Sequence, residues 1–484
     1  MLDAVVVGSG PNGLAAALVL ARAGLSVEVF EGAPTPGGGS RTEELTLPGF
    51  HHDVCSTIQS MTSLSPFFRE IDDVLVRRQV SLRKPELAFA HPLDRGRVAV
   101  VSASLDETAA GLGADGAAYR RLLGPLVGEA SALAAAVLAP LRHPPSHPIT
   151  MARFALDGLP SASRLSRRFE SAEARALIAG VCAHSMLPLD RALTSAFGLF
   201  LTVAAHDGGW PVVEGGSATL INALVAELLD AGATVHVERP IRQFGDLPRA
   251  RSVLFDTSPS AMVDIVGERL SSRYRAAVAR FQRAPGIFKV DYALSGPVPW
   301  RAEACRRAGT IHLGGTFEEV AESEADVAHG RHAERPYCIV VQASVADPTR
   351  APLGQHTLWA YCHVPNGSDV DMSTRIEDQI ERFAPGFRDL VLARSTMSGV
   401  DAERHNPNYL GGDISGGAGT LRQTLFRPTL RWNPYRTGTP GLYLCSASTP
   451  PGGGVHGMCG WGAARTVLKD LQGRRKFSGH LLRR

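Results

Sequence analysis

The order of apolar runs and glycines at the start of the chain predicts a strand, a helix and a second strand. Leu2–Val7 is almost continuously apolar, which is typical of a parallel strand covered on both faces. Apolar residues then recur at helical spacing over residues 14–23, and Gly24 stands where a helix would end. A second apolar run over residues 25–30 ends at Glu31.

The same periodicities predict the elements of the rest of the chain. Two longer apolar stretches, residues 130–141 and 192–205, fall short of the ~20 residues that a membrane-spanning helix needs, so we expect buried helices there. The second stretch is expected to be a core helix, with the wall of an apolar pocket as the alternative. The remaining predicted elements are a helix over 218–229 and strands over 233–237, 252–256, 287–294, 337–343, 357–364 and 441–448.

Composition places the chain among ordinary globular proteins. Its 484 residues are 44% hydrophobic and 20% charged, and this length favours two domains. A net charge of +3 is too mild to indicate nucleic-acid binding. The seven cysteines include no CxxC pair, which argues against a disulfide framework, a structural zinc site and a redox dithiol.

The expected location is the cytoplasm. The first predicted strand leaves no room for a signal sequence, and scattered free thiols fit a reducing compartment. A peripheral membrane contact stays open, because the basic tail over residues 474–484 is either a solvated end or a partner for an anionic membrane surface.

The first glycine motif has the features of a dinucleotide-binding turn. Gly8 permits the tight turn, Gly10 lets the backbone approach a pyrophosphate, and Gly13 lets helix and strand pack closely. The helix start offers free N–H groups to phosphates, and Glu31 is placed to accept hydrogen bonds from an adenosine ribose. The residues expected to bind the cofactor here are Gly8, Gly10, Pro11, Asn12, Gly13 and Glu31.

A second glycine motif follows at once and is similar to that of the amine oxidase and phytoene desaturase superfamily. The residues Gly38, Gly39, Ser40 and Arg41 resemble the family's GG-R-x-x-[ST] pattern, and this resemblance implies FAD as the cofactor. Gly39 stands where the family often has arginine, and the arginine comes two residues later. Arg41 is expected to neutralise the pyrophosphate, with a surface arginine as the alternative.

The resemblance extends to the C-terminus. After the helix over 218–229 the family's chain returns to the FAD domain, which implies an adenine contact near Ile241. The glycine-rich stretch after residue 448 resembles the family's binding segment for the flavin ring, where a helix start favours negative charge on reduced flavin. Many relatives carry Asp in the turn where this chain has Ser446-Ala447-Ser448. The cofactor-binding residues implied here are Ser448, Gly454, Val455, His456 and Met458.

Most similar are the phytoene desaturase-like oxidoreductases, in particular the pyridine nucleotide-disulfide oxidoreductase domain-containing type, with stretches 47–53 and 405–413 as signatures. No second strand–GxGxxG–helix unit is found, so a separate nicotinamide domain is not expected. The implied fold is α/β. A discontinuous Rossmann-like FAD-binding domain takes residues 1–75, 208–285 and 425–484, and a mixed α+β substrate domain takes 76–207 and 286–424.

The chemistry is left to the flavin, with the protein positioning the substrate. His456 is the candidate catalytic residue as a hydrogen-bond or proton donor, with a structural role as the alternative. His51 and His52 have no further ligands, so no metal site is expected. His405, Asn406, Tyr409 and Asp413 form a polar loop that is either catalytic or turn chemistry.

The resemblance implies dehydrogenation or desaturation of a small apolar substrate, with hydride transfer to FAD and reoxidation by oxygen or a quinone. A flavin amine oxidase and a redox-neutral polyene isomerase are the enzymatic alternatives. A non-catalytic flavin-binding scaffold is the alternative from another class. The sequence leaves the substrate and the oligomeric state open.

Overall fold

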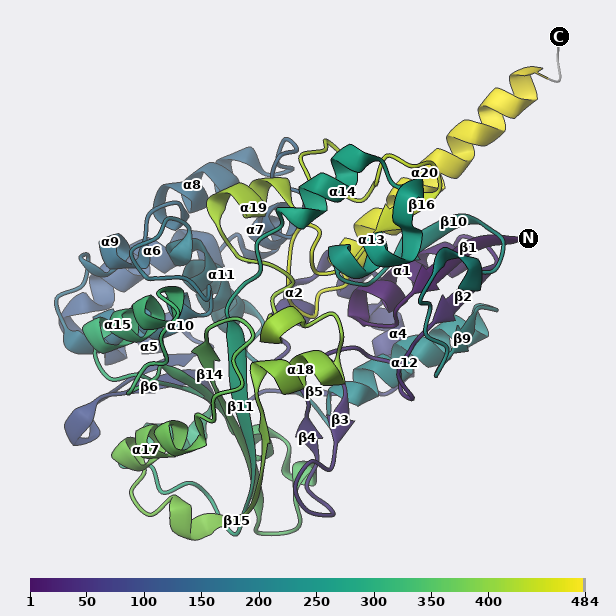
Figure 1. Cartoon of the computed structure of the whole chain (residues 1–484). Helices are drawn as coiled ribbons and strands as arrows, with labels where there is room; N and C mark the ends of the chain where they lie inside the picture. Colours follow the sequence, from purple (N-terminus) through teal and green to yellow (C-terminus); the bar gives the residue numbers. More distant parts are fainter. Residues whose placement is uncertain (482–484) are drawn as a thin grey trace.

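The computed structural model describes residues 1–481, with side chains up to residue 472. It contains two large sheets with helices packed around them (Figure 1). The first sheet has five parallel strands in the order β16-β10-β1-β2-β9. Its strands are β1 (Leu2–Val7), β2 (Val27–Phe30), β9 (Thr234–His236), β10 (Ala250–Phe255) and β16 (Leu442–Leu444). Three stretches far apart in the sequence, all within the segments predicted for the FAD domain, therefore build one sheet.

Both faces of this sheet are covered, which explains the continuous apolar run of β1. Ala4 and Val6 point into a core shared with α1 (Pro11–Arg22), α12 (Ser217–Asp230) and α20 (Met458–Leu481). Val5 and Val7 point into a second core with α13 (Pro259–Val266) and α14 (Ser272–Ala279). Alternate side chains of one strand thus enter two different cores.

The second sheet is mixed and has seven strands in the order β15-β11-β14-β13-β12-β6-β7. Only β6 and β12 pair in parallel, and all the other neighbours are antiparallel. Its strands are β6 (Leu87–Pro92), β7 (Val98–Ser102), β11 (Gly286–Leu294), β12 (Ala308–Leu313), β13 (Cys338–Val341), β14 (His356–Val364) and β15 (Val391–Met397). The strand predicted over 337–343 is shorter than expected, because a helix begins at Ala343.

Two small strand pairs connect these parts: β3 (Thr42–Glu43) with β4 (His52–Asp53), and β5 (Leu82–Arg83) with β8 (Val212–Val213). The other α-helices are α2 (Ser60–Leu64), α3 (Pro66–Glu70), α4 (Asp72–Arg77), α5 (Leu105–Gly111), α6 (Gly116–Val127), α7 (Ala130–Val137), α8 (Pro148–Gly158), α9 (Ala162–Ser166), α10 (Ala172–Ala183), α11 (Thr194–Asp207), α15 (Phe317–Ala328), α16 (Ala343–Ala346), α17 (Ser373–Phe383), α18 (Gly399–His405) and α19 (Leu421–Phe426).

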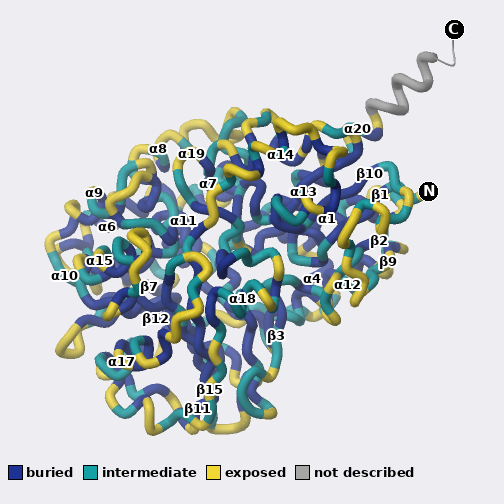
Figure 2. Tube along the Cα trace, viewed as in Figure 1, coloured by how far each residue is buried: buried dark blue, intermediate teal, exposed yellow. Residues whose placement is uncertain are grey.

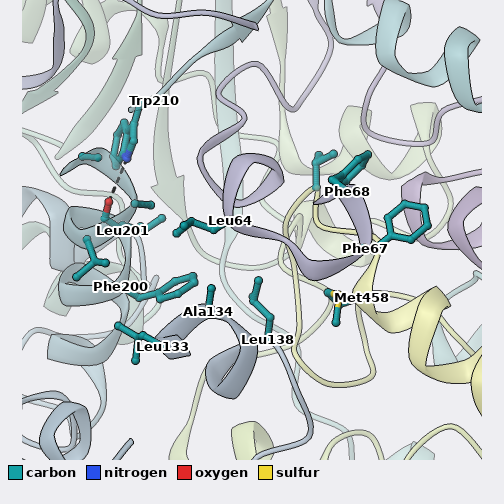
Figure 3. Close-up of a cluster of buried hydrophobic side chains, with 14 of the residues drawn as sticks. Leu64, Phe67, Phe68, Leu133, Ala134, Leu138, Phe200, Leu201, Trp210 and Met458 are labelled. Atoms are coloured by element: carbon teal, nitrogen blue, oxygen red, sulfur yellow. Dashed lines mark hydrogen bonds between the residues drawn. The ribbon is translucent and has the colours of Figure 1, made fainter. Parts of the chain in front are cut away.

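A cluster of buried apolar side chains joins the helical layer to the start of α20 (Figure 3). It includes Leu64 of α2, Leu133 of α7, Phe200 of α11 and Met458. Trp210 also belongs to this cluster, and its Nε1 donates a hydrogen bond to the Leu201 carbonyl over 3.1 Å. Of the stretches expected to be buried helices, α11 is buried along most of its length, whereas α7 ends at Val137 and buries only one side, with exposed and half-buried residues on the other (Figure 2).

The predicted α/β class, with a Rossmann-like domain and a second mixed domain, is confirmed. Among the helices of residues 1–481, none is long and apolar enough to cross a membrane. The basic side chains of the tail, residues 474–484, lie outside those that the structure describes, and the membrane contact stays a prediction.

Candidate dinucleotide and substrate site

The first glycine turn is packed so tightly that it excludes side chains. Gly8 has φ +96°, and a Cβ at Gly13 would lie 2.3 Å from the Gly8 carbonyl oxygen. A Cβ at Gly10 would lie 2.7 Å from Oδ2 of Asp256, which follows β10. The glycines thus allow the turn, the start of α1 and the Asp256 side chain to pack closely together, and the approach of a pyrophosphate to this backbone stays a prediction.

Two buried polar atoms near this turn have no hydrogen-bond partner within the described part of the chain. They are Oδ1 of Asn12 and Oγ of Ser40, on residues with 5% and 1% exposure. Buried polar atoms are normally paired, so unpaired ones indicate a missing ligand. Pro11 is the first residue of α1, where its lack of an N–H costs nothing. The Ser40 hydroxyl and the free amides at the start of α1 can donate to the phosphates of a dinucleotide, whereas Oδ1 of Asn12 is an acceptor and needs a donor.

The second glycine motif lies directly against the first. Gly37 donates from its amide to the Ser9 carbonyl over 3.0 Å, and a Cβ at Gly38 would lie 3.1 Å from the Gly10 Cα. A Cβ at Gly39 would lie 1.9 Å from the Tyr409 hydroxyl. The small residues of this motif thus allow two backbone segments and a tyrosine to meet in one place.

Glu31 and Arg41 lie together beside these turns. The Glu31 carboxylate accepts from the amide and the hydroxyl of Ser9, over 3.0 and 2.6 Å, and from the Ala33 amide over 2.9 Å. The Arg41 guanidinium lies 3.7 Å from Glu31 and donates to the Thr35 carbonyl. Arg41 is buried, which excludes the surface arginine that was its alternative. Its contact with a pyrophosphate stays a prediction.

The segment predicted to contact adenine runs beside Glu31. Arg239 and Glu238 donate from their amides to the carbonyls of Glu31 and Ala33, over 2.8 and 3.0 Å. Ile241 follows and is partly buried against the core formed by β1, β10 and α13. The segment that precedes Ile241 therefore runs next to Glu31, and the adenine contact stays a prediction.

The C-terminal glycine motif is hydrogen-bonded to α2 and to the residue that precedes α3. Thr62 donates to the Val455 carbonyl over 2.6 Å, and Ser65 donates to the His456 carbonyl over 2.5 Å. Gly454 has φ +123°, and a Cβ there would lie 2.8 Å from the sulfur of Met61. Ser448 is buried in the turn before it, and α20 begins at Met458.

Both ring nitrogens of His456 are within hydrogen-bond distance of backbone groups in its own turn. Nε2 lies 3.1 Å from the Gly452 carbonyl, and Nδ1 accepts from the Met458 amide over 3.0 Å. Burial lowers the pKa of His456 to about 4, so the ring is neutral at pH 7. Because both nitrogens are used within the chain, this geometry favours the structural role over proton donation.

One contact that the sequence did not reveal brings the two ends of the chain together. A Cβ at Gly460 in α20 would lie 1.8 Å from the carbonyl oxygen of Asn12 in α1. The C-terminal motif therefore lies beside the first glycine turn, and the three motifs meet at one site.

A small pocket opens next to the second glycine motif. Its cavity volume is about 20 Å³, which is room for about one water molecule. It takes residues from β11, β14, β15 and α18, and two members of the predicted polar loop, His405 and Tyr409, line it. Asp413 instead binds the Ala284 amide over 2.9 Å. The other lining residues are Val54, Cys55, Ile287, Lys289, Tyr361, Met397, Ala402 and Ile414.

Lys289 brings a buried charge to this pocket. Its Nζ lies 2.5 and 2.6 Å from the two carboxylate oxygens of Asp291 and donates to the Asp53 carbonyl over 3.1 Å. Lysine is rarely buried without a partner. No motif in the sequence marks this pair. The available signal was a charged pair two residues apart in a predicted strand, which puts both side chains on one face.

A second buried ion pair holds the strand β4 in place. Arg350 lies 3.0 Å from Asp53 and 2.8 Å from Asp347, with all three side chains at most 1% exposed. His52 is neutral beside them, because burial, Lys289 and Arg350 lower its pKa to about 3. No cluster of metal-ligating side chains is found in the part of the chain that the structure describes.

Comparison with known proteins agrees with this geometry. Residues 6–71 match the model of the NAD(P)-binding Rossmann-like domain. The pyridine nucleotide-disulfide oxidoreductase domain-containing protein 2 of Mus musculus is 25% identical, over 97% of this chain and 94% of its own. The lycopene-forming phytoene desaturase of Pseudescherichia vulneris is 24% identical, over 60% of this chain and 62% of its own.

The solved structure of wild-type putrescine oxidase bound to putrescine is similar in fold. Its TM-score is 0.63 at 18% identity, over 97% of this chain and 99% of that one. The chain thus contains a Rossmann-like domain at its N-terminus, and its overall fold is similar to that of putrescine oxidase. Its resemblance to the phytoene desaturase-like and amine oxidase proteins is confirmed.

Proposed function

We propose that the chain is an FAD-dependent oxidoreductase that dehydrogenates or desaturates a small apolar substrate. The observation that carries this proposal is the convergence of three glycine motifs. Gly38 lies against Gly10, and Gly460 lies against Asn12, although these residues are far apart in the sequence. A long, bent dinucleotide needs close backbone approach at several points, and such convergence supplies it.

Different residues of the site would bind different parts of the cofactor. The first turn with Asn12 and Ser40 would hold the phosphates, and Arg41 would balance their charge. Glu31 would bind the ribose and the backbone near Ile241 the adenine. The flavin end would lie against Ser448, Gly454, Val455 and Met458. FAD would supply the hydride acceptor, and the protein would exclude water and orient the substrate.

The proposed substrate site is the pocket next to the second glycine motif, which must widen from its present volume of about 20 Å³ to admit a substrate. Five of its lining residues, Val54, Ile287, Met397, Ala402 and Ile414, are apolar, which favours an apolar substrate. The Lys289 charge is neutralised by Asp291, so it does not demand an anionic ligand. The proposed electron acceptor is oxygen or a quinone. The seven free cysteines support a cytoplasmic location. If the acceptor is a membrane quinone, the protein would also contact the membrane surface.

A flavin amine oxidase is the second candidate, because two tyrosines face the same pocket. Tyr361 and Tyr409 both line it, and aromatic rings bind cationic amines. Five of the lining side chains are apolar and only two are tyrosines, a balance that favours an apolar ligand. The apolar substrate is therefore the preferred proposal.

The test is anaerobic reduction of the FAD-loaded protein by two substrate panels. One panel contains cyclic monoterpenes and polyenes, and the other contains primary amines and diamines. We expect the apolar panel to bleach the flavin absorbance. Bleaching by amines alone would establish the oxidase instead. Isomerised polyene without bleaching would establish the isomerase, and no reaction with either panel would establish the scaffold. Admission of air, with and without a soluble quinone, then identifies the acceptor.

A matched variant links the reaction to this pocket. Tyr409→Phe removes only the hydroxyl that approaches Gly39, and it should change the rate of bleaching more than the affinity for FAD. An unchanged rate would argue that the substrate binds elsewhere.

A further inference from the structure

Asp256, which follows the last residue of β10, occupies the start of the first helix. Its amide donates to the Val7 carbonyl over 2.8 Å, and its Oδ2 accepts from the Gly13 amide over 2.8 Å. Oδ2 also lies 2.7 Å and 2.9 Å from the positions where Gly10 and Gly13 would carry a Cβ. The side chain is partly buried. One carboxyl group therefore fills the space that the glycines leave open.

This is the place where the proposed function puts a cofactor phosphate. The amide of Gly13 is among the first donors of α1 and follows Asn12, whose Oδ1 is unpaired, and the unpaired Oγ of Ser40 belongs to the second glycine motif, whose Gly38 lies against Gly10. An ionised carboxylate and a pyrophosphate need the same donors and repel each other. The two ligands can share the site only if one of them gives up its charge.

The groups around Asp256 do not stabilise its negative charge by an ion pair. Glu31 on the β2 side adds a second negative charge, and the guanidinium beside Glu31, that of Arg41, is 3.7 Å from Glu31 and bound to the Thr35 carbonyl. The thiols of Cys445 after β16 and Cys459 in α20 are neutral, because burial raises the pKa of each. Within residues 1–481 no salt bridge includes Asp256.

The local environment makes a neutral Asp256 accessible near physiological pH. Loss of water raises the pKa of its carboxyl to about 7, and the charge of Glu31 acts in the same direction. The amides of Gly13 and Gly10 oppose this by donating to the carboxylate. A protonated carboxyl donates a hydrogen bond, and a phosphate oxygen is a strong acceptor for it.

We propose that Asp256 controls the affinity for the dinucleotide: ionised, it competes with the pyrophosphate for the amides of α1, and protonated, it binds the pyrophosphate. This inference rests on the proposed FAD site and adds a specific residue and a pH dependence to it. Binding of FAD above neutral pH then takes up one proton per site, and the affinity weakens as the pH rises.

The experiment measures FAD binding to the apoprotein by quenching of flavin fluorescence, from about pH 6 to about pH 9. We expect the Kd of the wild type to rise about tenfold per pH unit above pH 7, as competition with one ionisation requires. Asp256→Asn keeps the size and the acceptor for Gly13 but cannot ionise. Its Kd should stay constant within about twofold over the same range. At about pH 9 it should be at least tenfold below that of the wild type.

Two controls separate this effect from a structural one. Asp3→Asn removes a carboxylate at the opposite end of β1, where it pairs with Arg251, and should keep the slope of the wild type. Calorimetry of FAD binding at about pH 8, in buffers of different ionisation enthalpy, measures the proton uptake. We expect nearly one proton for the wild type and none for Asp256→Asn. The wild-type measurements stand even if the variant does not fold, and Asp256→Ser then replaces it.

The outcomes distinguish the inference from the proposed function. FAD binding that is independent of pH, without proton uptake, overturns the role of Asp256 and leaves the FAD site intact. Weaker binding by Asp256→Asn at every pH also overturns it, since this result would make the ionised carboxylate a required ligand. Failure of the folded wild type to bind FAD at any pH would overturn both.

Discussion

Arg350 is the residue whose removal should most clearly report on the buried ion pairs. Its guanidinium has no exposure to solvent and bridges Asp53 of β4 and Asp347 before η6 (Pro348–Arg350). It also donates to the Val213 carbonyl of β8 over 3.0 Å. The substitution Arg350→Met keeps most of the apolar volume and removes the charge. It leaves two buried carboxylates without their shared cation.

The expected loss of unfolding free energy follows from the burial of Arg350 and its two carboxylates. Breaking a buried ion pair on one side destabilises a protein by about 3–5 kcal/mol, because the remaining charge is uncompensated. Asp53 keeps other donors, the Thr42 hydroxyl at 2.7 Å and the Ser217 amide at 2.8 Å. These contacts place the expected loss near the lower end, about 3 kcal/mol.

The assay is urea unfolding at pH 7 for the wild type, Arg350→Met and a control, Arg120→Ala. Arg120 pairs with Asp106 at 2.6 Å, but the two side chains are 46% and 81% exposed. Such exposed pairs contribute less than about 1 kcal/mol. A loss for Arg350→Met no larger than that of the control would refute the reasoning, since it would mean that the two carboxylates need no cation.

Three further predictions concern the glycine turns and the histidines. Gly13→Ala should abolish FAD binding, because the new Cβ would lie 2.3 Å from the Gly8 carbonyl; Gly245→Ala meets nothing within 4 Å and should bind FAD normally in the same fluorescence titration. Gly460→Ala should lower the thermal unfolding midpoint, because its Cβ would lie 1.8 Å from the Asn12 carbonyl; an unchanged midpoint would contradict the α1–α20 packing. Stability in urea should fall between pH 7 and pH 5, because burial lowers the pKa of His91 to about 4 and the unfolded chain takes up the proton first, below about pH 6.5; His91→Gln should reduce this pH slope.

The N-terminal half of the cofactor site could be predicted because its determinants are local. A strand, a glycine turn and a helix are specified by neighbouring residues, and β1 and α1 lie where the pattern placed them. The second sheet was harder. In β15 exposed and half-buried residues alternate along its whole length, so no apolar pattern indicates this edge strand. In β6 the buried residues include His91, which breaks the apolar run.

The site chemistry depended on contacts between distant residues, which a single sequence does not reveal. Arg350 and Asp53 are almost three hundred positions apart, and neither has a local signal for its partner. Asp256 lay at the end of a predicted strand, but its approach to Gly13 follows from the order β10-β1 in the sheet. His456 shows the converse case, since a motif position indicated chemistry where the turn itself uses both ring nitrogens.

The most direct test of the central claim is the visible spectrum of the purified protein after equilibration with FAD at about pH 6 and removal of free flavin. Under these conditions the proposed competition by Asp256 is weakest. The account predicts a flavin spectrum corresponding to one FAD per chain. A folded protein that retains no flavin under these conditions would contradict the assignment of the three glycine motifs to a cofactor site.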